Sequence, residues 1–237
     1  MFKLDEDILR TYIKLEEYQR QRLWLERLLH PEKFKWSKRG SPPKISETKT
    51  IRIDVLGSMG FGESWYRRMC QSEKDAKTEL AQLACSHPLW VHFERINGFA
   101  EYLAGAFIAA GGDIQRAPTA SAFWKGMGLD LLPDGTPPRK QRGKKDNQRK
   151  IPALPHVTRI GEQIRQQIIR SDGKLRRMYE HYRKYYDEKY PSRAKMFNFK
   201  AAERVTQKIL YACLWKCWRE SYGLPAPMPY AFDILKH

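Results

Sequence analysis

The chain has 237 residues, of which 41% are hydrophobic, and it carries a formal net charge of +17 at pH 7 with a pI of about 9.8. This apolar content excludes a disordered tail, and no stretch approaches the roughly 20 apolar residues of a membrane span. The excess of positive charge indicates a polyanionic partner, with DNA, RNA and an anionic membrane surface as the candidate classes.

The amino-terminal region, residues 1–31, predicts one long amphipathic helix. Apolar side chains recur at steps of three and four from Phe2 to about His30, and Pro31 ends the pattern. Such a stripe needs a packing partner, either the rest of this chain or a second copy, and residues 2–30 are available for docking to a protein partner. The segment lacks the apolar core of a secretory signal, so we expect a cytoplasmic protein that is nucleoid-associated if it binds DNA.

Residues 32–63 are interpreted as a linker. Gly40, Pro42 and Pro43 break the helical periodicity, and TKTIRIDV alternates like one short strand. The glycines in GSMGFGES are interpreted as a turn, because no Lys-Ser/Thr pair follows them as in a nucleotide-binding P-loop.

Residues 64–222 predict a helical domain, and the proline-rich residues 223–237 predict an extended strap. From His87 onward an apolar helix, an Asn97-Gly98 break and a small-residue helix follow one another, which is the layout of a helix-hairpin-helix. The predicted fold class is therefore mainly α, with at most one short strand. Helices are expected over about 63–86, 100–110, 119–127, 156–171, 173–189 and 200–221.

The hairpin at Asn97, Gly98 and Phe99 is the first candidate nucleic-acid contact. A tight turn leaves backbone N–H groups at the start of the second helix, where orphan donors and the helix dipole attract a phosphate oxygen. Glycine permits both the turn and the close approach of a nucleic-acid backbone. Such a contact reads no bases. The plainer alternative is two packed helices with a glycine between them.

The second candidate is the basic segment within residues 133–155, where Asp146 alone opposes a dense run of cations. We expect this run to lie along phosphates, so that binding weakens steeply with salt. Two cations earlier in the chain, Arg116 and Lys125, are assigned to the same surface. The predicted cations of the run are Arg139, Lys140, Arg142, Lys144, Lys145, Arg149 and Lys150.

A third group mixes tyrosines and cations in YEHYRKYYDEKYPSR. The tyrosines are candidates for stacking on unpaired bases, but the helical spacing of Tyr179, Tyr182 and Tyr186 favours core packing. The tyrosines of this group are Tyr179, Tyr182, Tyr185, Tyr186 and Tyr190.

Metal chemistry has little support in the sequence. Asp54, after the possible strand, is the one acidic residue placed as metal-dependent phosphoryl transfer requires. The four cysteines form no Cys-x-x-Cys pair, and Cys213 and Cys217, one helical turn apart, are expected to be apolar helix residues. No cofactor is predicted. The histidines lack ligand spacing and are assigned to surface or capping roles, namely His87, His92, His156 and His181.

Residues from about 78 to 220 resemble the carboxy-terminal domain of Piv/MooV-type invertases and insertion-sequence transposases. The matching features are FERINGFAEYLAGAFIAAGGDIQ, the Gly128-Leu129 pair followed by Pro133, the basic RGKK, LRRMYEHYRKYYDEKYP and AAERVTQKILYACLWKCWRE, in that order. The resemblance implies a helix-hairpin-helix that binds DNA, in a setting of recombination or mobile elements.

Two departures limit what the resemblance implies. Residues 1–77 lack the strand pattern of the family's ribonuclease-H-like catalytic domain, and Thr136 is the only hydroxyl near the place of the family's serine nucleophile. We therefore expect a non-catalytic nucleic-acid-binding protein, with DNA as the first partner and no membrane partner, acting in a nucleoprotein complex of a mobile element, recombination or defence system. The alternatives are an active recombinase or nuclease, and an RNA-binding structural component of a ribonucleoprotein.

Overall fold

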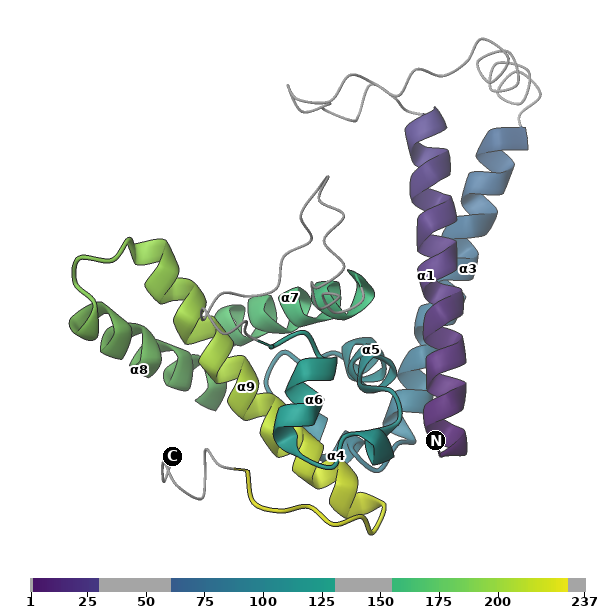
Figure 1. Ribbon diagram of the computed structural model, residues 1–237. Helices are drawn as coiled ribbons and strands as arrows, with labels where there is room; N and C mark the ends of the chain where they lie inside the picture. The colour runs from purple at the N-terminus through teal and green to yellow at the C-terminus, as the bar shows by residue number, and fades with distance from the viewer. Residues whose placement is uncertain (1, 30–60, 131–154, 230–237) are drawn as a thin grey trace, which may run out of the picture. The chain divides into compact units, whose positions relative to one another are not determined.

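The computed structural model describes residues 2–29, 61–130 and 155–229 (Figure 1). All the regular elements in these ranges are helices, and the ranges contain no strand, which confirms the predicted mainly α class. The possible strand TKTIRIDV, Asp54, Thr136 and the seven cations between 139 and 150 lie outside the described residues. The described residues fall into two compact units, residues 10–80 and residues 1–9 together with 81–237.

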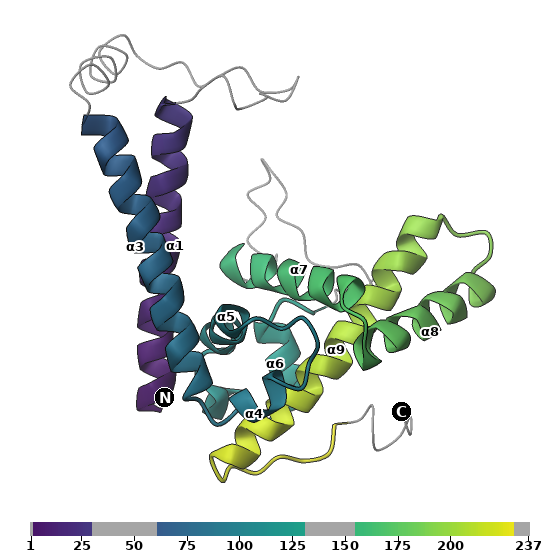
Figure 2. The ribbon, with the colours of Figure 1, turned by 180° about the vertical axis from the view of Figure 1, so that it is seen from behind.

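The unit of residues 10–80 is a pair of long antiparallel helices (Figures 1 and 2). Helix α1 spans Lys3–Leu29 and helix α3 spans Phe61–Cys85, so the predicted long amino-terminal helix is confirmed. The apolar stripe of α1 packs on α3 of the same chain. The buried apolar residues of this unit are Tyr12, Leu15 and Leu25 on α1 and Met69, Ala76 and Leu80 on α3.

Polar bonds fix the register of these two helices. The buried Glu73 carboxylate accepts a hydrogen bond from Arg22 Nε at 2.5 Å and from Gln19 Nε2 at 3.3 Å. Near the other end of the pair, Thr11 donates to Glu79 at 3.2 Å. A slide of one helix by a turn would break both connections.

The second unit is built around α9, a helix of 27 residues. Most of α5 is buried, with every residue from 103 to 109 in the core, so α5 is a central helix rather than an amphipathic one. Gly111 permits the close approach of α5 and α9, because a Cβ there would lie 2.6 Å from Trp218 Cζ3. The elements of this unit are α4 (Trp90–Phe93), α5 (Glu101–Gly111), the 3-10 turn η2 (Ile114–Arg116), α6 (Ala120–Gly126), α7 (Pro155–Arg170), α8 (Lys174–Lys189) and α9 (Lys195–Ser221).

Aromatic side chains fill the core of this unit. Phe107 on α5 meets Phe123, Tyr211 and Trp218 at ring-centroid separations of 5.9, 5.1 and 6.5 Å. The first two pairs are edge-on, an arrangement that adds to the stabilisation from burial of apolar surface. The core therefore joins α5, α6 and α9.

One buried guanidinium joins distant segments of the second unit. Arg219 is 5% exposed, and its Nη1 donates to the carbonyl oxygens of Ile114 and Ala117 while its Nε donates to Pro225 O at 2.6 Å. Trp215 Nε1 also donates to Ala117 O, at 2.8 Å. The strap after α9 is thereby tied to η2.

A buried polar cluster anchors residues 1–9 to the same unit. The Leu89 N–H donates to His87 Nδ1 at 3.1 Å, so Nε2 carries the imidazole proton and donates to Asp5 Oδ1 at 2.9 Å. Tyr222 donates its hydroxyl to the same Asp5 oxygen at 2.7 Å, and burial followed by this bond raises the pKa of Tyr222. The sequence assigned His87 to a surface or capping role, but the side chain is only 2% exposed and bonds to Asp5, a residue 82 positions earlier.

Two other expectations change. The helix expected before the Asn97-Gly98 break is a single turn, α4, so the predicted helix-hairpin-helix is not confirmed. Cys213 is exposed and Cys217 is half-buried on α9, so the expected apolar burial is wrong for Cys213. No helix in the described ranges is long and apolar enough to cross a membrane.

Candidate nucleic-acid interface

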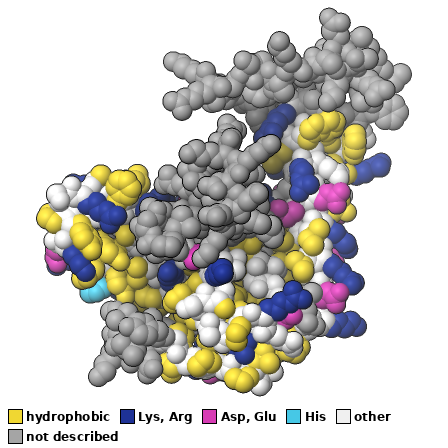
Figure 3. Space-filling model, in the orientation of Figure 1, with side chains coloured by type: hydrophobic (Ala, Val, Ile, Leu, Met, Phe, Trp, Pro, Cys, Tyr) yellow, Lys and Arg dark blue, Asp and Glu magenta, His cyan; other side chains and the backbone are white. Residues whose placement is uncertain are grey.

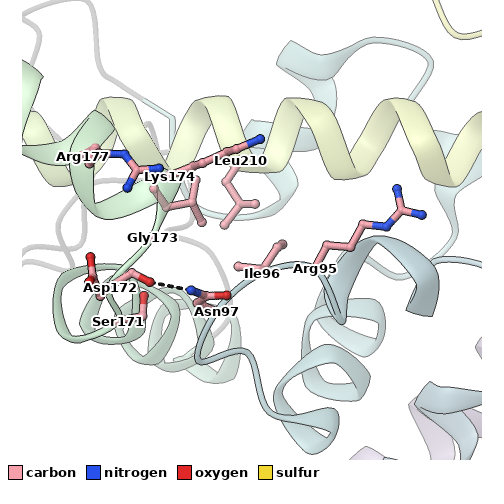
Figure 4. A pocket seen from close by; sticks show the side chains of 10 residues that line it. Arg95, Ile96, Asn97, Ser171, Asp172, Gly173, Lys174, Arg177 and Leu210 are labelled. Atoms are coloured by element: carbon pink, nitrogen blue, oxygen red, sulfur yellow. Dashed lines mark hydrogen bonds between the residues drawn. The ribbon is translucent and has the colours of Figure 1, made fainter.

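A pocket of about 600 Å³ lies between the turn after α4 and the start of α8 (Figure 4). Figure 4 shows Arg95 on one side of the pocket and Lys174 and Arg177 on the other, and all three side chains are exposed. The charged residues of the lining are thus three cations and one carboxylate, that of Asp172. The lining residues are Arg95, Ile96, Asn97, Ser171, Asp172, Gly173, Lys174, Leu175, Arg177 and Leu210.

The turn at residues 94–99 is held by its own backbone and by the end of α7. Ile96 N–H donates to Phe93 O at 2.9 Å, and Gly98 has a φ of 79°, a conformation that favours glycine. A Cβ on Gly98 would lie 3.0 Å from Ser171 Cβ. Asn97 Nδ2 donates to Asp172 O at 2.5 Å. The turn is therefore locked against the loop that starts α8.

The start of α8 supplies the opposite wall. Gly173 is the N-cap residue, and it offers no side chain to accept from the first turn. The first intrahelical bond runs from Arg177 N–H to Gly173 O at 3.1 Å, so the N–H groups of the three preceding residues have no acceptor within the helix. Orphan N–H donors, the helix dipole and nearby cations together favour an anionic oxygen at this wall.

The predicted hairpin residues have unequal places at this site. Asn97 lines the pocket, and the glycine that the sequence singled out at position 98 is required by packing on Ser171. Phe99 is 8% exposed and stacks on Phe93 with a centroid separation of 5.0 Å, while its N–H donates to Ile96 O. Because both its ring and its N–H are engaged within the protein, Phe99 is a core residue, and its part in nucleic-acid binding stays a prediction.

The other predicted cations are not gathered at the pocket. Arg116 ends η2 with an exposed side chain, 3.6 Å from the Asp113 carboxylate. Lys125 is exposed in the last turn of α6. The roles of both in nucleic-acid binding stay predictions.

A half-buried cationic cluster that the sequence analysis missed lies where α6, α7 and α9 meet. Lys208 Nζ is 5.1 Å from the Trp124 ring centroid, and Arg204 Nη2 donates to Asp130 O at 2.5 Å. Burial and then nearby Arg165 lower the pKa of Arg204, and burial and then Arg204 lower that of Lys208. The i,i+4 spacing of Arg204 and Lys208 was visible in the sequence, but the approach of Arg165 on α7 was not.

The described ranges contain no set of ligands for metal-dependent chemistry. Within them, no group of three or more histidine, cysteine, aspartate or glutamate side chains is arranged to hold a metal ion. The Asp113 carboxylate accepts from Gln115 N–H at 3.2 Å and caps η2. Comparisons of the chain with protein-family models, curated proteins and solved structures find no match.

Proposed function

We propose that this chain binds nucleic acid through backbone phosphates, with duplex DNA as the preferred ligand and the pocket between the 94–99 turn and α8 as a contact point. The observation that carries the proposal is that Arg95, Lys174 and Arg177 line one pocket together with the uncapped amino end of α8. Each of these groups donates hydrogen bonds or attracts negative charge, and together they match a phosphate.

The charge of the whole chain supports the same partner. A net charge of +17 produces a long-range attraction for polyanions, and the run of seven cations between 139 and 150 adds a dense local source of it. A contact made only to phosphates reads no sequence, so binding at this pocket is expected to depend on the shape of the nucleic acid.

The biological setting is proposed from the resemblance to insertion-sequence transposases. In this proposal α4, the turn and α5 act as a short helix-hairpin-helix, and the chain is a non-catalytic relative that works within a nucleoprotein complex. Residues 2–30 would then serve as the docking element for another component.

The first test is a binding titration at two salt concentrations with Mg²⁺ present, using duplex DNA, a four-way DNA junction, single-stranded DNA and structured RNA. The test variant is Lys174→Ala/Arg177→Ala, and a matched control, Lys14→Ala/Arg68→Ala, removes two exposed cations from the α1–α3 pair. Each lost phosphate contact lowers the slope of log K against log salt by about 0.9 for duplex DNA, so the test variant should lose about 1.8.

The outcomes of this titration distinguish the proposed function from its alternatives. A reduced slope in the test variant but not in the control supports the pocket as a phosphate contact. An equal effect of both variants reduces the pocket to general electrostatic attraction. Cleavage of the strands with Mg²⁺ would replace the proposal with a recombinase or nuclease, and preference for structured RNA would replace it with a ribonucleoprotein component.

A further inference from the structure

Exposed aromatic side chains gather at the end of the second unit where α8 turns into α9. Four large apolar residues in this one stretch are exposed, although a compact protein normally scatters such residues singly. Figure 3 shows hydrophobic and basic side chains intermixed over this end, at the left of the view. The exposed fractions are 43% for Tyr185, 40% for Tyr190, 65% for Met196 and 58% for Phe197. We name this surface the aromatic tip and define it by Tyr185, Tyr186, Lys189, Tyr190, Arg193, Met196 and Phe197.

The rings of the aromatic tip form a short stack. Tyr186 and Tyr190 are one helical turn apart, with ring centroids separated by 6.3 Å and planes inclined by only 16°. Tyr185 meets Tyr186 edge-on at 5.3 Å. Flat rings presented in series are the feature on which unpaired bases stack without regard to sequence.

Cations lie between the rings. Lys189 Nζ is 5.2 Å from the Tyr185 ring centroid and 5.6 Å from that of Tyr190. The Arg193 guanidinium is 5.6 Å from Tyr190 and 5.5 Å from Phe197. An exposed cation–π contact is weaker than the stacking of a base on an aromatic ring. Bases can therefore displace these cations from the ring faces, and the cations can then bind the adjoining phosphates.

The acidic residues nearby are already engaged elsewhere. Asp187 accepts from Arg183 at 3.1 Å, and Glu188 lies 3.9 Å from Lys184. Within the described ranges, Lys189 and Arg193 form no ion pair with a carboxylate. Positive charge beside exposed rings fits a polyanion that carries flat apolar groups better than it fits an acidic or a purely apolar protein surface.

The scaffold under the aromatic tip is fixed by the core. Tyr179 is buried and meets Phe199 edge-on at 5.8 Å, which packs α8 on α9. Asn198, 2% exposed, donates to Asp187 Oδ1 at 2.9 Å and to Tyr190 O at 3.4 Å. One side chain of α9 thus holds the end of α8, and the rings are positioned before any ligand arrives.

We propose that the aromatic tip binds single-stranded nucleic acid by stacking unpaired bases on Tyr185, Tyr190 and Phe197, with Lys189 and Arg193 on the phosphates. The proposal rests on the proposed nucleic-acid function and extends it to a second ligand class at a second site. The protein would then engage duplex at the pocket and unpaired strand at the tip.

The test compares loss of the rings with exchange of one ring for another. Tyr190→Leu/Phe197→Leu keeps the tip apolar but removes stacking, and the matched control Tyr190→Phe/Phe197→Tyr keeps both rings. Each variant of the full chain is titrated with oligo-dT, oligo-U and duplex DNA. Removal of a stacking ring should weaken binding about tenfold or more for each base that it held, with duplex affinity unchanged. The relative affinities for oligo-dT and oligo-U then identify DNA or RNA as the source of the strand.

The outcomes distinguish this proposal from the one on which it rests. Weaker single-strand binding in the leucine variant alone supports the tip, whether or not the pocket variant alters duplex binding. Equal single-strand affinity of all three proteins refutes the tip, while salt-sensitive duplex binding keeps the proposed function. Equal weakening by both variants refutes stacking as the cause. Loss of self-association in the leucine variant, measured by sedimentation, would assign the tip to contact with a second copy of the chain. Absence of binding to every nucleic-acid ligand would overturn both proposals.

Discussion

Removal of one hydroxyl from the buried cluster of Asp5, His87 and Tyr222 should lower the stability of the second unit measurably. Tyr222→Phe keeps the ring, which stacks on Phe2 at 3.6 Å, but deletes the donor to Asp5 Oδ1. Asp5 is 2% exposed and its other oxygen, Oδ2, has no hydrogen-bond partner. A bond to a charged group contributes about 1.5–3 kcal/mol, so we expect a loss of about 2 kcal/mol in the free energy of unfolding at pH 7.

The pH dependence supplies a second, independent check. The pKa of Tyr222 is raised in the folded protein, so the folded state holds this proton more tightly than the unfolded state does. The resulting stability is fully present below the ordinary tyrosine pKa of about 10 and is lost as the pH rises beyond it. The difference between the native protein and Tyr222→Phe should therefore shrink above pH 10.

Urea titrations at pH 7 and at pH 10.5 measure both effects. Tyr185→Phe is the control, because that hydroxyl is on an exposed ring and its removal should change stability by less than about 0.5 kcal/mol. A loss below 0.5 kcal/mol for Tyr222→Phe at pH 7, or a loss that does not shrink at high pH, would refute the assignment of the hydroxyl as a buried donor to Asp5.

Two further predictions concern the candidate interface. Gly98→Ala should lower the free energy of unfolding by about 1–3 kcal/mol, because φ is 79° there and the new Cβ would press on Ser171. Thermal unfolding measures the loss, and an unchanged midpoint would contradict the packing argument. Lys208→Met should leave the free energy of unfolding within about 1 kcal/mol of the native value, since the ammonium is half-buried beside Arg204. The same change should reduce the slope of log K against log salt for duplex binding. A large loss of stability with an unaltered slope would make Lys208 a structural residue alone.

The local architecture was largely predictable because periodicity and breakers are local signals. The helix ending before Pro31, the glycine stop after α5 and the ends of α8 follow from apolar spacing and from residues that cannot continue a helix. The short α4 escaped prediction, because an apolar run can be core without being one helix.

The candidate site was less predictable because it depends on contacts between distant residues. Nothing near Arg95 in the sequence indicates that it will face Lys174 and Arg177 across a pocket. The burial of His87 likewise depends on Asp5, 82 positions away. Conversely, Gly98 was identified correctly as a position that needs glycine, but its contact is with Ser171 of the same chain.

The tyrosine-rich segment shows why helical spacing alone could not decide between core and surface. Tyr179 belongs to the core, as the spacing favoured, whereas Tyr185 and Tyr190, toward the other end of α8, are exposed. Buried and exposed tyrosines therefore lie on the same helix, and stacking of bases on the exposed ones stays a proposal.

The buried guanidinium of Arg219 has a practical consequence for dissecting this protein. A domain boundary placed at residue 222, where helical periodicity ends, would cut between the arginine and Pro225 and leave one of its donors without an acceptor. The same guanidinium donates to the carbonyl oxygens of Ile114 and Ala117. A displaced Arg219 would therefore also weaken the attachment of η2, more than 100 positions earlier in the chain. The residues just after α9 therefore belong to the folded unit, although their proline-rich sequence does not indicate it.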